Sequence, residues 1–176
     1  MISWLKNSKK ILSIVAVTGA IIGTMPFIAL AQSNSGVTLF GGVDRENILN
    51  YYLDFGGRSK SWDRYRLRIP GNKLTEGVSK LYVVYPDYFD GKFDTDEIQV
   101  RLNNKPLPLR EVIWDQESRV IEINLEQPLL ESRNIEIVMS NVYNPSSGTF
   151  YLQGQMMTAG QIPLRLSLGT WILSIN

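Results

Sequence analysis

The side chains in this sequence that could take part in chemistry are carboxylates, arginines, lysines, hydroxyls and tyrosines, because histidine is absent and cysteine is absent. Without these two residue types there is no Ser-His-Asp triad, no cysteine nucleophile, no disulfide and no zinc site of thiolates or imidazoles. Carboxylate pairs remain, but a glycosidase needs two carboxyl groups across a cleft, which neighbouring positions on a strand do not create. The sequence therefore favours a non-catalytic protein, with a carboxylate enzyme acting on a polysaccharide as the weaker alternative.

The densest group of carboxylates is an acidic stretch at 87–97, and it includes Asp87, Asp90, Asp94 and Asp96. Calcium binds several carboxylate and carbonyl oxygens, often from one flexible loop. The stretch lacks the D-x-D-x-D-G spacing of an EF-hand loop. A solvated turn in which Asp87 and Asp94 cap backbone N–H groups is the simpler interpretation. We therefore expect no cofactor, with calcium at these four residues as the alternative.

Three arginines form a basic row, since Arg64, Arg66 and Arg68 alternate with apolar residues and so project from one face of a strand. Guanidinium groups in such a row suit carboxylated or sulfated glycans, or lipid phosphates, through bidentate contacts. The same row also suits a solvent-exposed face that is paired with carboxylates on neighbouring strands, for example Glu122 or Glu136. Both interpretations remain open at this point.

Two aromatic residues, Trp62 and Tyr88, lie in stretches of sequence that are rich in turn residues. Exposed aromatic rings stack on sugars and anchor protein interfaces, whereas buried ones fold a loop back onto the core. Trp62 and Tyr88 are thus candidate ligand contacts. Phe89 and Phe93 lack a polar end, and we expect them in the core.

These side chains must be positioned by β-strands, because apolar and polar residues alternate with a period of two over most of the chain. The alternating runs lie at 51–55, 65–69, 81–85, 98–102, 121–125, 135–139, 150–152, 162–168 and 171–175. Turn residues such as Pro70-Gly71-Asn72 separate them. The predicted fold class is all-β, an immunoglobulin-like antiparallel β-sandwich of about seven to nine strands.

The N-terminus predicts a secretory signal peptide at 1–31, a signal helix that precedes the sandwich. Lys6, Lys9 and Lys10 come before an apolar run, and Ala29-Leu30-Ala31 has the small-x-small form of a cleavage site. An uncleaved membrane anchor is the alternative, since residues 11–31 are long enough to span a bilayer. Residues 32–40 would then form a flexible leader and a first strand, and residues 41–176 the sandwich domain.

Cleavage after Ala31 would leave 15 basic and 17 acidic residues, a net charge of −2. This charge and the predicted export both argue against nucleic acid as a partner. The absence of cysteine excludes a lipid anchor at the new N-terminus. We expect a protein of the periplasm or the extracellular face, in contact with a membrane only if the segment stays uncleaved.

Four blocks that occur in order resemble a known family. They are YLDFGGRSKSWDRYRLRIPGNKL at 52–74, YPDYFDGKFDTDEIQVRLNNKPL at 85–107, VIWDQESRVIEINL at 112–125, and the tail NVYNPSSGTFYL…LGTWILSI at 141–175. The pattern is similar to a secreted cyanobacterial family called domain of unknown function 2808. The resemblance implies a cyanobacterial envelope or extracellular protein. It implies no activity and assigns no functional residues.

Together these features predict an exported, non-catalytic binding module of the cell envelope. The ligand would be an envelope glycan or an envelope protein, met through Trp62, Tyr88 and the arginines at positions 64, 66 and 68. The alternative is a structural accessory subunit of an envelope assembly, held by pairing between strand edges.

Overall fold

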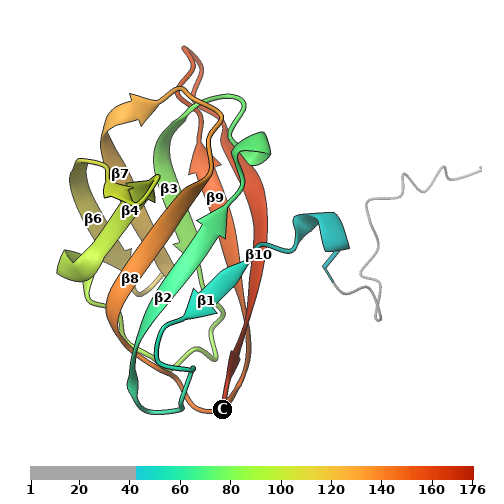
Figure 1. Cartoon of the computed structure of the whole chain (residues 1–176), viewed down its shortest axis with the longest axis vertical. Coiled ribbons are helices and arrows are strands. Elements are labelled where there is room, and N and C mark those ends of the chain that lie inside the picture. The colour runs from blue at the N-terminus through green and yellow to red at the C-terminus, as the bar shows by residue number, and fades with distance from the viewer. Residues whose placement is uncertain (1–42) are drawn as a thin grey trace, which may run out of the picture. The chain divides into compact units, whose positions relative to one another are not determined.

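Two five-stranded antiparallel sheets face each other in the computed structural model, which describes residues 43–176 (Figure 1). Sheet I has the strand order β1-β2-β8-β4-β5, and sheet II has the order β10-β9-β3-β7-β6. The predicted all-β sandwich of antiparallel strands is therefore confirmed. The predicted signal peptide at 1–31 and leader at 32–40 lie outside the described residues.

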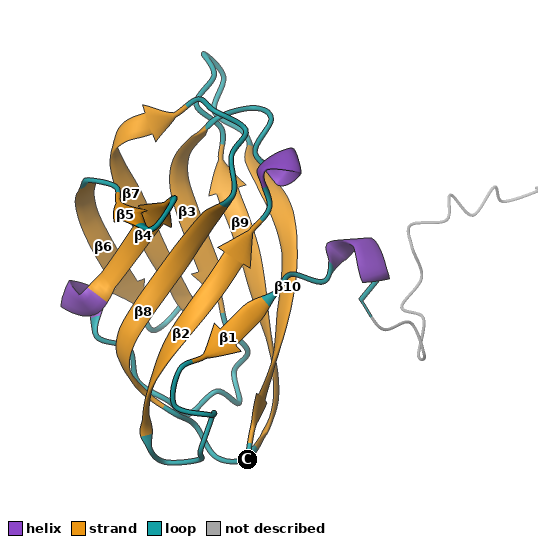
Figure 2. Cartoon of the chain, viewed as in Figure 1, coloured by secondary structure: helices purple, strands orange, loops and turns teal. Residues whose placement is uncertain are grey.

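Strands make up nearly all of the regular structure, as Figure 2 shows. Sheet I consists of β1 (Tyr51–Leu53), β2 (Trp62–Ile69), β8 (Ile135–Tyr143), β4 (Ile98–Leu102) and β5 (Lys105–Pro106). Sheet II consists of β10 (Arg165–Ile175), β9 (Gly148–Met157), β3 (Val78–Val84), β7 (Val120–Leu129) and β6 (Leu109–Asp115). The other regular elements among the described residues are three single 3-10 turns: η1 (Arg45–Asn47), η2 (Gly71–Lys73) and η3 (Thr95–Glu97).

The predicted count of seven to nine strands is too low, because the described residues contain ten. β5 has only two residues, and a register shift between Leu109 and Glu111 interrupts the alternation of β6. The runs predicted at 162–168 and 171–175 are one strand, β10, with a bulge between Ser167 and Gly169. Ile162 precedes this strand and is exposed in the turn from β9 to β10.

Alternate side chains of most long strands fill the space between the sheets. On β2, for example, Tyr65, Leu67 and Ile69 are buried. Trp171 of β10 is fully buried, and its indole Nε1 donates a hydrogen bond to the backbone oxygen of Arg68 at 3.2 Å. Because successive side chains of a strand point to opposite faces, burial of these residues places the intervening ones on the outside of sheet I.

Candidate functional site on the outer face of sheet I

One row of β2 side chains runs along the outer face of sheet I and consists of Trp62, Arg64, Arg66 and Arg68. The residues between them are buried, so the pleat fixes which face the row occupies. Trp62 and Arg68 are six positions apart, which corresponds to about 20 Å along an extended strand. The tryptophan and the three arginines predicted as ligand contacts therefore share one face.

Arg66 is the centre of this row and is fully paired. Its Nε and Nη2 donate to the two carboxylate oxygens of Asp54 at 2.7 and 3.0 Å, and its Nη1 donates to Glu136 at 3.3 Å. The hydrogen bond from Arg66 is the main reason why the pKa of Asp54 is lowered, and the charges of Arg66 and Arg64 add to it. The same contact raises the pKa of Arg66.

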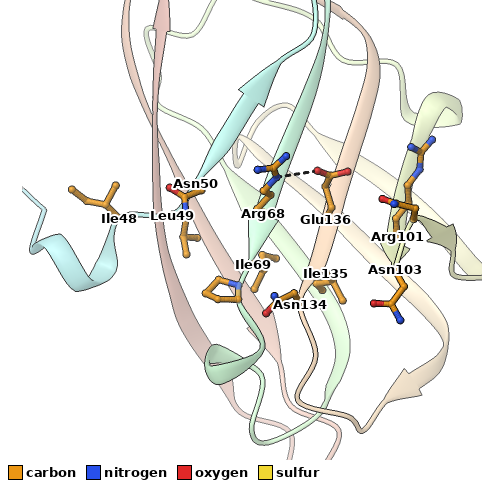
Figure 3. A pocket seen from close by; sticks show the side chains of 12 residues that line it. Ile48, Leu49, Asn50, Arg68, Ile69, Arg101, Asn103, Asn134, Ile135 and Glu136 are labelled. Atoms are coloured by element: carbon orange, nitrogen blue, oxygen red, sulfur yellow. Dashed lines mark hydrogen bonds and ion pairs between the residues drawn. The ribbon is translucent and has the colours of Figure 1, made fainter.

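The two outer arginines of the row are also paired. Arg64 donates from Nε to Ser140 Oγ at 3.0 Å, and its Nη1 lies 3.5 Å from Asp54. Arg68 donates from Nε to Glu136 at 3.3 Å (Figure 3). Glu136 thus pairs across strands as the sequence suggested, whereas Glu122 lies on sheet II and pairs with Lys80 at 2.7 Å. The row is an ion-pair network and not three free charges.

Trp62 begins the row and stands at the edge of an open hollow. Trp62 is 60% exposed, and its ring meets that of Tyr143 edge-on with centroids 5.3 Å apart. The hollow has a volume of about 610 Å³. It is lined by Trp62, Lys92, Phe93, Asp94, Thr95, Trp114 and Asn141, and we call it the Trp62 hollow.

The second tryptophan of the hollow comes from the other sheet. Trp114 of β6 donates from Nε1 to the hydroxyl of Tyr85 at 2.8 Å, and its ring packs edge-on against Phe93 at 5.5 Å. Two polar side chains are also joined here, since Asn141 Nδ2 donates to Asp94 at 3.3 Å. Fixed aromatic rings next to an amide, a carboxylate and an ammonium group are the components of a site for a polyhydroxylated ligand.

A buried carboxylate fixes the start of β2 and therefore the base of Trp62. Asp63 is only 1% exposed and accepts hydrogen bonds from the backbone N–H groups of Phe55, Gly57 and Arg64 at 2.9, 2.7 and 2.7 Å. The side chain of Asn144 donates to it as well. Four donors on one carboxylate hold the connecting loop 54–61 against β2.

Tyr88 is exposed but does not join the Trp62 hollow. The residue is 55% exposed, and its ring stacks on Phe150 of β9, with centroids 5.5 Å apart. Tyr88 is not among the residues that line the Trp62 hollow. Phe89 and Phe93 are buried, as expected from their lack of a polar end.

The four predicted calcium ligands do not come together. Asp90 is paired with Lys60 and accepts two hydrogen bonds from Ser146, at 2.7 and 2.9 Å. These contacts hold the pKa of Asp90 well below its usual range, and the hydrogen bond from Lys60 has the largest effect. Asp94 instead accepts from the backbone N–H of Asp96 at 3.2 Å. Within residues 43–176 no three carboxylates are grouped closely enough to hold a metal ion.

Several side chains of this face were not singled out from the sequence. Asn141 has a positive φ of 52° on β8, and Lys92 pairs through its backbone with Tyr143. Neither feature leaves a signal in the sequence, because both depend on strands that are distant along the chain. Trp114 was not singled out either, because it reaches the hollow only through the position of β6 on sheet II, next to η3.

The fold defines the chain as an antiparallel β-sandwich protein with one strongly polar sheet face. Residues 37–175 match the family described as "Protein of unknown function (DUF2808)", and the chain belongs to that family. No curated protein matches the sequence. In the part of the chain that the structure describes, no helix has the length and apolar character needed to cross a membrane.

Three solved structures are similar in fold at low sequence identity. The bacterial hydrophobin BslA has 15% identity and a TM-score of 0.46, over 77% of this chain and 97% of that one. A Nocardia farcinica protein with an immunoglobulin-like fold has 10% identity and a TM-score of 0.48, over 73% and 97%. The collagen-binding domain of a Staphylococcus aureus adhesin has 10% identity and a TM-score of 0.41, over 73% and 96%. The family assignment rests on the family match alone.

Proposed function

We propose that this protein is an exported, non-catalytic binding module of the cell envelope, and that its ligand is a glycan that stacks on Trp62. The observation that supports this most strongly is the large exposed fraction of Trp62, 60%, beside a hollow that already contains a second tryptophan. A ligand that covers this surface would remove apolar area from water, which favours binding.

The polar groups around this ring favour a sugar over an apolar ligand. Sugar rings present apolar C–H faces to aromatic side chains and hydroxyls at their edges. Lys92 offers a donor and Asp94 an acceptor, while the amide of Asn141 offers both. Hydroxyl groups need such mixed partners when they leave water.

A non-catalytic role is supported by the state of three carboxylates on or next to β2. Asp54 and Glu136 are held in ion pairs with arginines, and Asp63 is occupied by backbone N–H groups. A general acid needs a raised pKa, but the pKa of Asp54 is lowered. None of the three is suited to deliver a proton to a glycosidic oxygen.

Export is supported by the N-terminal sequence, where three lysines precede an apolar run and an Ala-Leu-Ala site. The sandwich would then act in the periplasm or outside the cell. The absence of cysteine fits either location, because the packed core alone can hold a domain of this size.

Sedimentation with envelope fractions tests this proposal. Residues 43–176 form one compact unit that contains the whole hydrophobic core. A chain that begins at Gln32 is therefore suitable for the experiment. It is mixed with isolated peptidoglycan, outer membranes and exopolysaccharide at low and high salt. We expect salt-resistant binding to a carbohydrate fraction, because stacking on an aromatic ring is not screened by ions.

Two matched variants give this experiment its control. Trp62→Ala should abolish the sedimentation without lowering the melting temperature, since the ring is mostly exposed. Tyr151→Ala removes an exposed aromatic from sheet II and should leave sedimentation unchanged. If wild type and Trp62→Ala sediment equally, or if neither binds any fraction, the glycan proposal is overturned.

A further inference from the structure

A second hollow lies at the opposite end of the outer face of sheet I. This cavity of about 350 Å³ is open to solvent, and we call it the Arg101 trough. Its polar side chains come from five segments: Asn50 before β1, Arg68 on β2, Asn134 and Glu136 at the start of β8, Arg101 on β4, and Asn103 in the turn after β4 (Figure 3).

Strand register places one carboxylate between two guanidinium groups in the trough. Arg68 is opposite Glu136 on one side, and Arg101 is opposite Glu136 on the other. Adjacent strands are about 4.8 Å apart, so the two arginine-bearing strands are separated by about 10 Å. Figure 3 shows the three side chains next to one another along this line.

The carboxylate of Glu136 is bonded towards β2 and not towards β4. It accepts from Arg66 and from Arg68, each at 3.3 Å. Arg101 donates instead to Gln99 Oε1, at 3.1 and 2.9 Å, which is a neutral acceptor two residues away on its own strand. Within residues 43–176, Arg101 forms no ion pair with a carboxylate.

The charge on this face is therefore unbalanced at one end. The ion-pair network uses Asp54 for Arg64 and Arg66, and Glu136 for Arg66 and Arg68. Arg101 brings a fourth positive charge that these two carboxylates do not reach. A negatively charged group that binds at Arg101 would complete the network, and a guanidinium fork matches the two oxygens of a carboxylate.

The remaining polar groups of the trough match hydroxyls. Asn134 accepts from the backbone N–H of Gly71 through Oδ1 at 2.7 Å, which leaves its NH₂ group for another partner. Asn103, with a positive φ of 51°, adds an amide from the turn. Glu136 is a pure acceptor and would repel a small multiply charged anion such as sulfate or phosphate. It would instead accept hydrogen bonds from hydroxyl groups.

We propose that the Arg101 trough binds a carboxylate-bearing sugar unit of an acidic glycan. Arg101 pairs with the carboxylate, while Glu136 and the Asn134 amide bond to hydroxyls. This inference rests on the proposed function and narrows its ligand to acidic glycans. The β2 row of about 20 Å joins the trough to the Trp62 hollow, so a single polymer chain can touch both.

Titration calorimetry with short oligosaccharides tests the inference. The chain beginning at Gln32 is titrated with hexagalacturonate, which carries carboxylates, and with cellohexaose, which is neutral. We expect hexagalacturonate to bind about tenfold more tightly, because it adds charge-assisted hydrogen bonds. Arg101→Gln should remove that advantage. Arg110→Gln, which changes an exposed arginine of β6 on sheet II, should preserve it.

The possible results separate the two proposals. If both sugars bind equally through Trp62 and Arg101→Gln has no effect, the acidic-glycan inference fails and the proposed function stands. If neither sugar binds although the chain sediments with a carbohydrate fraction, the acidic-glycan inference fails and the proposed function stands. If a hexaglutamate peptide binds as tightly as hexagalacturonate, the trough recognises carboxylates without the sugar, and the inference is overturned as well.

Discussion

The side-chain amide of Asn144 donates to the buried carboxylate of Asp63 at 3.4 Å, although the two residues are 81 positions apart. The carbonyl of the same amide accepts the hydroxyl hydrogen of Tyr65 at 2.6 Å. Burial is the main cause of the strongly raised pKa of Tyr65, and the negative charge of Asp63 adds to it. These three side chains connect the start of β2 to the end of β8, beneath the ring of Trp62.

The first prediction concerns the stability of this buried network. Asp63→Ala leaves the N–H groups of Phe55 and Gly57 without their acceptor, and should lower the free energy of unfolding by about 3 to 5 kcal/mol. Asp63→Asn retains one acceptor oxygen and should cost less. Urea denaturation measures both. The exposed Asp87→Ala is the control, with an expected change within about 0.5 kcal/mol, and equal losses in Asp63→Ala and Asp87→Ala would contradict the prediction.

The second prediction is a pH dependence that originates at Asp54. Its pKa is lowered below the ordinary value of 3.8, chiefly by the hydrogen bond from Arg66. A lowered folded-state pKa means that this carboxylate stabilises the fold fully above about pH 4, and that the contribution is lost as the pH falls through the folded-state pKa. Asp54→Asn should therefore cost about 1 to 2 kcal/mol at neutral pH and much less near pH 2.

Urea unfolding of wild type and Asp54→Asn at several pH values measures this difference. The exposed residue Asp87 again supplies the control, because Asp87→Asn should leave the pH dependence of stability as it is in the wild type. The prediction would be contradicted if the difference in unfolding free energy between wild type and Asp54→Asn stayed constant from pH 7 down to pH 2. The ion pairs of Asp54 would then not stabilise its carboxylate form.

The strands could be predicted from the sequence wherever one face of the sheet is buried. On β2, Tyr65, Leu67 and Ile69 alternate with arginines, and the structure buries all three. β5 could not be predicted, because two residues cannot show a period. Ile162 was wrongly placed in a strand, since Pro163 and the bond from Leu164 N to Thr158 Oγ1 close a turn there.

The candidate site was only partly predictable, for a related physical reason. The shared face of the three arginines follows from their spacing along one strand, so the sequence alone could group them. Trp62 was expected in a turn-rich stretch, but β2 begins at this residue and places it on the same face. The contribution of Arg101 depends on the register of β4 against β8, which side-chain alternation does not specify. Tyr88 was grouped with Trp62 by residue type, but its loop packs the ring on Phe150 instead.

The third prediction concerns the close contact between Gly154 and Trp171 in the core. A Cβ atom at Gly154 would lie 2.7 Å from Cη2 of the Trp171 ring and 2.9 Å from its Cζ3. The ring is fully buried and cannot move without disturbing its neighbours, so Gly154→Ala should destabilise the fold by about 1 to 3 kcal/mol. Gly160→Ala is the control, because a Cβ there meets no atom closer than 3.9 Å. Thermal melts that rank the two variants equally would refute this account of the core.

The last prediction is that removal of calcium leaves the domain unchanged. Asp90 is already paired with Lys60 and Ser146, and Asp94 is bonded to Asn141 and to the backbone of Asp96. Extracellular calcium sites have dissociation constants of about 0.1 to 1 mM, so 10 mM calcium at such a site would stabilise the fold by at least about 1.4 kcal/mol. In a domain of this size, that would raise the melting temperature by about 3 to 6 °C. We expect shifts within about 1 °C between EDTA and 10 mM calcium chloride, with 10 mM magnesium chloride as the control. The prediction would be wrong if calcium, but not magnesium, raised the melting temperature and Asp90→Asn removed that rise. Such a result would mean that the carboxylates of this loop rearrange around the ion.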